Sequence, residues 1–148
     1  MKRVLFLCTG NACRSQMAEG WTRKEFGKEL DVFSAGMIKH GLDPKAVRVM
    51  NEAGVDISGQ FSKTVDELPV QQFDAVITLC DHANESCPFF PGPVQRLHES
   101  FDDPPSLTAN PGDKESGLDV YRRVRDEIRK FVQELPRILD EHSREHAS

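Results

Sequence analysis

Short apolar runs alternate with longer amphipathic stretches along the chain. The runs at residues 4–7, 32–34, 75–79 and 94–97 have the length and composition of short strands. Two of them, "VLFL" at 4–7 and "AVITL" at 75–79, carry almost no polar side chain, which is typical of strands buried on both faces of a sheet. The pattern therefore predicts a sheet that is covered on both faces.

Helical patterns occupy three stretches: from about residue 15 to 27, from 44 to 53, and from about 118 onward. Asp43 and Pro44 suit the N-cap and first position of the second helix, and Gly54 suits the position just after its end. Residues 99–116 are mostly loop formers. We expect the last helix to kink at Pro136.

The alternation of strand and helix, without a repeat or a linker, predicts one α/β domain over residues 1–148 with a parallel sheet. The length matches the usual size of one domain. We expect the tail at about 142–148 to fray, as chain ends often do. Ligands of such sheets bind beyond the carboxyl ends of the strands, which is where Cys8 and Cys80 stand.

Charge and hydropathy exclude several classes of protein. The formal net charge is −5, which disfavours a protein that binds nucleic acid. The arginines of "YRRVRDEIRK" do not change this, because Arg122 and Arg123 stand four residues before acidic side chains, as on a solvated helix face. No apolar run reaches the roughly 18 residues of a membrane span or the roughly 7 of a signal-peptide core. We therefore expect a cytoplasmic protein without a membrane partner.

The chain has four cysteines, which in a reducing compartment point to catalysis, redox chemistry or metal binding rather than to structural disulfides. Four residues separate Cys8 from Cys13, and six separate Cys80 from Cys87. Neither spacing is the two-residue knuckle of zinc sites. We therefore expect no transition-metal site and no cofactor.

The segment "CTGNACRS" lies between the first strand and the first helix. A backbone that turns there presents several N–H groups to one point, and the helix dipole adds positive charge. Gly10 and Asn11 tolerate the positive φ of a tight ring, and Arg14 can hold an oxyanion with two hydrogen bonds. A thiol in that field should lose its proton more readily than a free cysteine does. The pattern predicts that Cys8 is a nucleophile aimed at a tetrahedral anion.

A cysteine, five residues and then Arg-Ser near the start of the chain resemble the signature of the low-molecular-weight tyrosine phosphatase superfamily, and Asp103-Pro104 resembles its general-acid loop. The similarity extends from "RVLFLCTGN" to "YRRVRDEI". Within the superfamily, "CTGNACRSQMAEGW", "TLCDHANESC" and "FDDP" are most similar to the thioredoxin-coupled arsenate reductases. The resemblance implies a single three-layer α/β domain with a four-stranded parallel sheet in the order 2-1-3-4.

The number of cysteines supports the reductase branch independently. Reduction of arsenate to arsenite takes two electrons, which a second thiol supplies by forming a disulfide with the first. If the strands before Cys8 and Cys80 are neighbours, the two residues lie within disulfide reach. The resemblance implies that Cys80 attacks arsenylated Cys8, that Cys87 then attacks Cys80, and that thioredoxin reduces the Cys80–Cys87 bridge.

The spacing of Cys80 and Cys87 has a conformational consequence. If "CDHANESC" is helical when reduced, the two cysteines stand about 10.5 Å apart, beyond the roughly 7 Å limit for a disulfide. The segment must therefore unwind on oxidation. We expect the oxidised segment to be an exposed loop that partner reductases recognise.

The resemblance also implies roles for the residues around Cys8. Those expected to bind the substrate are Thr9, Gly10, Asn11, Ala12, Cys13, Arg14 and Ser15. Asp103 would protonate the departing oxygen when Cys8 attacks. Thr9 and Ser15 would donate hydrogen bonds to the Cys8 thiolate, and Asn11 would fix the shape of the loop. Cys13 is interpreted as dispensable packing, with a protective bridge to Cys8 as the alternative.

Two positions depart from the family pattern. Some related reductases bind potassium through residues that match Asn11, Glu19 and Ser34 together with a further acid, but Lys63 stands where that acid would be. Its ammonium would replace the ion, so we expect the rate to be independent of potassium. Phosphatases commonly carry a tyrosine after the Asp-Pro pair, whereas this chain has Pro105, which disfavours aryl phosphate substrates.

Two other functions fit parts of the pattern. A low-molecular-weight protein tyrosine phosphatase would use Cys8, Arg14 and Asp103, and the remaining cysteines would be bystanders or redox regulators. A sensor or phosphocarrier would hold an anion at Cys8 without turnover. For the reductase we expect a monomer that takes arsenate as its substrate and thioredoxin as its reductant, with glutaredoxin and glutathione as the alternative donor.

Overall fold

The computed structural model describes residues 2–108 and 117–146. The strands of its sheet are β1 (Lys2–Cys8), β2 (Leu30–Gly36), β3 (Ala75–Thr78) and β4 (Gln95–His98). They pair in parallel in the order β2-β1-β3-β4. This confirms the expected fold class and strand order.

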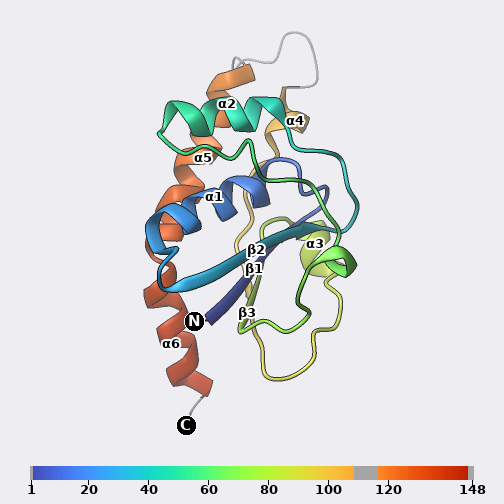
Figure 1. Cartoon of the computed structure of the whole chain (residues 1–148), viewed down its shortest axis with the longest axis vertical. Helices are drawn as coiled ribbons and strands as arrows, with labels where there is room; N and C mark the ends of the chain where they lie inside the picture. Colours follow the sequence, from blue (N-terminus) through green and yellow to red (C-terminus); the bar gives the residue numbers. More distant parts are fainter. Residues whose placement is uncertain (1, 109–116, 147–148) are drawn as a thin grey trace.

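The helices are α1 (Arg14–Phe26), α2 (Pro44–Glu52), α3 (Asp81–Glu85), α4 (Pro104–Leu107), α5 (Gly117–Gln133) and α6 (Leu135–His146), with one 3₁₀ turn, η1 (Val65–Glu67). In Figure 1, α1 and α5 lie on one side of the strands and α3 lies on the other. Both faces of the sheet are therefore covered, as the apolar runs predict.

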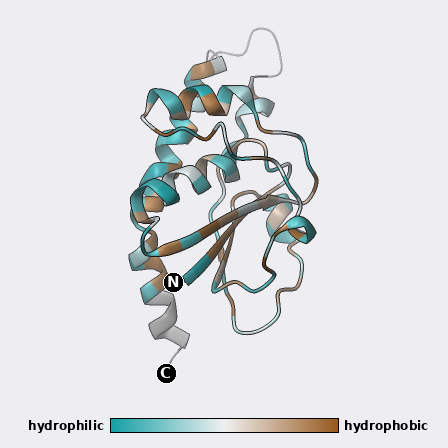
Figure 2. Cartoon of the chain, in the orientation of Figure 1, coloured by the Kyte–Doolittle hydropathy of each residue, from teal (hydrophilic) through white to brown (hydrophobic). Residues whose placement is uncertain are grey.

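The core lies between the sheet and the α1–α5 layer. Figure 2 shows hydrophobic strands and helices with one hydrophilic and one hydrophobic face. Leu5 and Phe6, successive residues of β1, are both fully buried, so each face of that strand is covered. Every residue of α1 from Arg14 to Thr22 is buried. Trp21 joins this helix to α5, because its Nε1 donates a hydrogen bond to the Arg125 carbonyl at 3.2 Å.

The second helix begins as predicted. The Asp43 carboxylate accepts a hydrogen bond from the Lys45 N–H at 2.9 Å, and Pro44 takes the first helical position. Gly54 has a φ of 86°, which a residue with a side chain rarely adopts. Strand β2 is longer than the three residues expected from its apolar run, because it pairs with β1 along its whole length.

The expectation of a loop over 99–116 is wrong in part, because α4 begins at Pro104. Its two prolines fill the first helical positions, where a missing N–H costs nothing. Residues 109–116 lie outside the described part of the chain. The sequence predicts a kink at Pro136, and the structure has a break between α5 and α6 just before this residue. Pro136 itself lies in the first turn of α6.

The arginines of α5 pair partly as expected. Arg123 reaches Glu127 at 3.3 Å, but Arg122 binds Asp119 of its own helix and Glu52 of α2 instead of Asp126. The tail predicted to fray is described as part of α6 as far as His146, and residues 147–148 lie outside the described part. Within residues 2–108 and 117–146, no helix is long and apolar enough to cross a membrane.

Candidate active site

Strands β1 and β3 are neighbours, with Leu7 opposite Thr78. Cys8 ends β1, and Cys80 follows β3, so the two thiols emerge at the same edge of the sheet. The Thr9 hydroxyl lies 3.3 Å from the Cys80 sulfur. All four cysteines are free. The adjacency on which the expected disulfide depends is therefore confirmed, and the structure represents the reduced state.

The loop after Cys8 is held by the segment that follows β2. The backbone carbonyls of Cys8, Thr9, Gly10 and Ala12 accept hydrogen bonds from the N–H groups of Met37, Ile38, His40 and Asp43, at 2.9 to 3.2 Å. These carbonyls therefore point away from the thiol, while the N–H groups of residues 10–13 have no acceptor among the described residues. Asn11 closes the ring with a φ of 50°. The loop has the form of an anion-binding nest.

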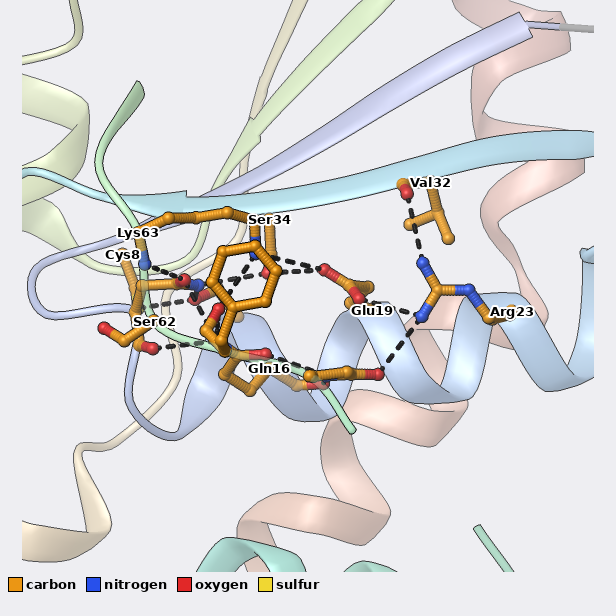
Figure 3. A network of polar contacts seen from close by, with 12 residues as sticks. Cys8, Gln16, Glu19, Arg23, Val32, Ser34, Ser62 and Lys63 are labelled. Carbon is orange, nitrogen blue, oxygen red and sulfur yellow. Dashed lines mark hydrogen bonds and ion pairs between the residues drawn. The ribbon is translucent and has the colours of Figure 1, made fainter. Parts of the chain in front are cut away.

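A chain of polar side chains leads from Cys8 into the core (Figure 3). The Ser15 hydroxyl lies 2.9 Å from the Cys8 sulfur, and it accepts a hydrogen bond from Nδ2 of Asn11 at 2.7 Å. Because its oxygen receives that bond, its own hydrogen is free to point at the sulfur. Ser15 is thus placed to donate toward Cys8, the role predicted for it.

The orientation of the Asn11 amide is set by its neighbours. The backbone N–H of Lys63 can only donate, and it lies 3.0 Å from Oδ1 of Asn11, so this atom is the oxygen. Gln16 donates to the same oxygen at 3.0 Å, and Nδ2 also donates to the Ser34 hydroxyl at 3.0 Å. Ser34 in turn donates to Glu19 at 2.7 Å. The bonds of the Asn11 amide favour this residue as the one that fixes the loop.

The residues matched to a potassium site carry an internal cation instead (Figure 3). The Lys63 ammonium is buried, lies 3.9 Å from Oε1 of Glu19, and donates to the Phe61 carbonyl at 3.0 Å. Burial lowers the pKa of Lys63, and the Glu19 carboxylate opposes this shift. The donor set does not fit potassium, because the ammonium already supplies a positive charge next to the carboxylate.

A pocket of about 180 Å³ opens at the nest and is lined by Cys8, Thr9, Gly10, Ala12, Cys13, Arg14, His40, Asp103 and Pro105. The Arg14 guanidinium donates to the Phe101 carbonyl at 3.1 Å and lies 3.6 Å from the Asp103 carboxylate. The pocket thus brings Asp103 to the loop from a distant part of the chain. Its volume is well below the roughly 300 Å³ at which pockets for larger organic ligands begin. It suits a small oxyanion.

Two further residues line the pocket; the sequence singles out one of them, Pro105, and gives no role to the other, His40. Pro105, which stands where the resemblance to phosphatases implies a tyrosine, lines the pocket. His40 had no predicted role, yet its ring stands against the Gly10 backbone, where a Cβ on residue 10 would come within 2.5 Å of Nδ1. The signal that could have revealed His40 is its place just after β2, at the same edge of the sheet as Cys8.

Cys13 differs from Cys8 in its surroundings. It is buried at the start of α1, and burial, then Asp43, Cys8 and Asp103, raise its pKa well above the ordinary value for a thiol. A neutral thiol is a poor nucleophile. The surroundings of Cys13 favour its interpretation as packing.

The segment from Cys80 to Cys87 differs from the expectation in two respects. Its helix α3 covers only Asp81–Glu85, because Pro88 disfavours helical geometry at Cys87. Thr9 contacts Cys80, not Cys8, so the expectation that it holds the first thiolate is wrong. The Cys80 sulfur also accepts a hydrogen bond from the Ala83 N–H at 3.4 Å, which places it at the N-terminus of α3.

The comparisons with known proteins agree with this geometry. A model of the family described as low molecular weight phosphotyrosine protein phosphatase matches residues 3–145. An arsenate reductase of Halalkalibacterium halodurans is 51% identical over 131 residues, which cover 88% of this chain and 92% of that protein. A solved arsenate reductase in the oxidized state has a TM-score of 0.72 and 31% identity, over 94% of this chain and 99% of the other.

A thioredoxin-dependent arsenate reductase of Corynebacterium glutamicum is also similar, with a TM-score of 0.68 and 25% identity over 95% of this chain and 62% of that one. The family match includes both the loop after β1 and the segment around Asp103. The chain therefore belongs to the low molecular weight phosphotyrosine protein phosphatase family.

Proposed function

We propose that this protein reduces arsenate to arsenite through a relay of Cys8, Cys80 and Cys87. The observation that carries the proposal is the pairing of a thiol in an oxyanion nest with a second thiol that the same loop contacts, at 3.3 Å from Thr9 to Cys80. A phosphatase needs only the first thiol and a water molecule. The names of the curated relatives support the reductase.

In the first step, the Cys8 thiolate attacks arsenic and an As–O bond breaks. Asp103, at the pocket wall, donates the proton with which that oxygen leaves as water. The guanidinium of Arg14 and the unpartnered N–H groups of residues 10–13 hold the remaining oxygens as charge builds up on them. The product is a Cys8–arsenate adduct.

In the second step, the Cys80 thiolate attacks the Cys8 sulfur. The S–As bond breaks, its electron pair stays on arsenic, and arsenite leaves while the two sulfurs are oxidised to a disulfide. The third step forms a Cys80–Cys87 disulfide and returns Cys8 as a thiolate. Thioredoxin reduces this last bridge. All three thiols belong to one chain, so a monomer in a reducing cytoplasm suffices.

The oxidation in the third step changes the conformation of the segment from Cys80 to Cys87. In the reduced state α3 separates Cys80 from Cys87, with both residues just outside its ends. We infer that the helix unwinds when the two sulfurs bond, because a disulfide requires the two Cα atoms to lie within about 7 Å of each other. We expect the amides of residues 81–87 to exchange hydrogen faster in the oxidised protein, and equal protection in both redox states would contradict this part of the proposal.

The experiment that tests the function follows NADPH consumption with thioredoxin, thioredoxin reductase and arsenate, beside the Cys87→Ser variant. Wild-type protein should turn over repeatedly. The variant should release one arsenite per molecule and then stop, because it cannot pass its disulfide on. Ser86→Ala, a change in the same segment that keeps every thiol, is the matched control and should retain turnover.

The other outcomes of this experiment are equally clear. Turnover only with glutathione and glutaredoxin would change the donor and keep the reductase. No arsenate-dependent oxidation with either donor, together with intact hydrolysis of an aryl phosphate, would make the protein a phosphatase. We expect phosphatase activity to be weak, because Pro105 gives an aromatic leaving group no aromatic wall.

A further inference from the structure

The side chain of Arg96 reaches the third cysteine of the relay. Its Nη1 donates a hydrogen bond to the Cys87 sulfur at 3.4 Å. Within residues 2–108 and 117–146, this sulfur is the one hydrogen-bonding or ion-pairing partner recorded for the Arg96 side chain. Arg96 is exposed and Cys87 is half-buried, so the contact lies at the surface of the molecule.

The position of Arg96 on β4 orients its side chain toward Cys87. Alternate residues of a strand share a face, so Arg96 and His98 point the same way. His98 binds the Asp81 carboxylate at 3.0 Å, at the start of α3, while Arg96 binds Cys87, just after its end. The same face of β4 therefore contacts the segment from Cys80 to Cys87 near both of its ends. The Asp81 carboxylate contacts His98 and not Arg96. Among the described residues, Arg96 is the charged side chain that contacts the Cys87 sulfur.

We propose that Arg96 is a positioning residue for Cys87: the guanidinium of Arg96 stabilises the Cys87 thiolate that attacks Cys80. The role in turnover rests on the proposed function. In that step the Cys87 thiolate, whose proton has gone to water, forms a bond to the Cys80 sulfur. The Cys8–Cys80 bond breaks, and its electron pair leaves with Cys8. A guanidinium that donates to the Cys87 sulfur makes a charge-assisted hydrogen bond to the attacking thiolate and so stabilises it.

The test isolates Cys87 from the rest of the relay. A full-length protein with Cys8→Ser, Cys13→Ser and Cys80→Ser keeps Cys87 as its only thiol. Its alkylation by iodoacetamide is followed from pH 6 to pH 10.5, with Arg96, with Arg96→Gln and with Arg96→Lys. Arg129→Gln, an exposed arginine of α5 that binds Glu25, is the matched control.

Exposed charge pairs contribute roughly 0.2–1 kcal/mol, so Arg96→Gln should slow alkylation near pH 7 by about 1.4- to fivefold. The rates should converge at high pH, where the thiolate predominates in every variant. Arg96→Lys should retain most of the rate and Arg129→Gln all of it. Equal profiles for Arg96 and Arg96→Gln would overturn the proposal. So would a loss that persists at the alkaline plateau, or a loss shared by Arg96→Lys, since neither depends on charge.

A second measurement connects Arg96 to turnover. With all cysteines present, Arg96→Gln should leave the release of the first arsenite unchanged and slow repeated turnover with thioredoxin. If the first arsenite is slowed equally, Arg96 acts on an earlier step and the proposal fails. The alkylation result does not require arsenate, so a protein that proves to be a phosphatase would leave it standing as a statement about Cys87.

Discussion

The Thr9 hydroxyl lies 3.3 Å from the Cys80 sulfur, so a residue of the Cys8 loop contacts the second thiol of the proposed relay. Together with the Ala83 N–H, this hydroxyl gives Cys80 two polar partners in an otherwise buried position. Both can donate to a thiolate, and hydrogen bonds to the charged form favour it. In the proposed relay, the loop expected to bind the anion thus also contacts the thiol that would attack next.

Replacing Thr9 by valine tests this contact. Thr9→Val keeps the shape of the side chain and removes the hydroxyl, so the Cys80 thiolate loses one donor. One hydrogen bond to a charged group contributes about 1.5 kcal/mol or more, which corresponds to roughly a tenfold slower release of arsenite in a single turnover. Thr9→Ser, which keeps the hydroxyl, should stay near the wild-type rate. A valine variant as fast as wild type would show that the contact is incidental.

Ser15→Ala should weaken the first step instead. The variant removes the donor 2.9 Å from Cys8 and leaves Nδ2 of Asn11 without that acceptor. We expect alkylation of Cys8 near neutral pH to fall by about tenfold or more, since hydrogen bonds to charged groups contribute roughly 1.5–3 kcal/mol. Ser58→Ala, on the exposed loop after α2, is the control. Unchanged alkylation in Ser15→Ala would mean that the backbone N–H groups alone hold the thiolate.

The internal cation at Lys63 predicts the response to salt. Its ammonium lies 3.9 Å from the Glu19 carboxylate, so a cation of the chain itself stands next to this acid. Turnover and the urea midpoint should therefore be the same in potassium chloride and in tetramethylammonium chloride of equal ionic strength. A stimulation specific to potassium would show that an ion binds in addition to Lys63.

Two buried acids predict a loss of stability at alkaline pH. Burial raises the pKa of Tyr121, whose hydroxyl donates to Asp43 at 2.5 Å, and burial likewise raises the pKa of Cys13. Above the unfolded-state values, about 8.5 for cysteine and about 10 for tyrosine, the unfolded chain releases these protons while the folded chain keeps them. The free energy of unfolding contributed by both groups is therefore complete at neutral pH and falls as the pH rises.

Urea denaturation at pH 7, 9 and 11 measures this effect. Tyr121 alone should lower the free energy of unfolding by about 1.4 kcal/mol at pH 11, one unit above its unfolded pKa. Tyr121→Phe lacks this ionisation, so the gap in stability between wild type and variant should narrow by that amount between pH 7 and pH 11. A constant gap would mean that Tyr121 ionises equally in both states.

Much of the fold could be predicted because local patterns and long-range packing agree. The apolar run at 4–7 belongs to β1, and Asp43 and Pro44 begin α2. The length of β2 could not be read from its apolar residues, because pairing with β1 extends it to Gly36. Helix α4 was missed because proline usually indicates a loop, and only its place in the first turn makes it compatible with a helix.

The candidate site divides in the same way. Cys8, Ser15 and Asn11 lie within one loop and helix start, so their mutual contacts depend on local geometry that the sequence reveals. The sequence does not indicate which way the Thr9 side chain turns, so its contact with Cys80 instead of Cys8 is visible only in the structure. His40 lines the pocket and Arg96 contacts Cys87 from distant parts of the chain, and only the packing of β2 and β4 against their neighbours reveals these positions.

The hydrogen bonds from residues 37–43 to the carbonyls of the Cys8 loop have an energetic consequence for substrate binding. Because they already hold the loop in its anion-binding shape, little ordering free energy remains to be supplied when the oxyanion arrives. The cost of that order is met once, when the chain folds, and not again in every catalytic cycle. Substitutions between Met37 and Asp43 that leave the pocket wall untouched should therefore act on anion affinity through the rigidity of the loop.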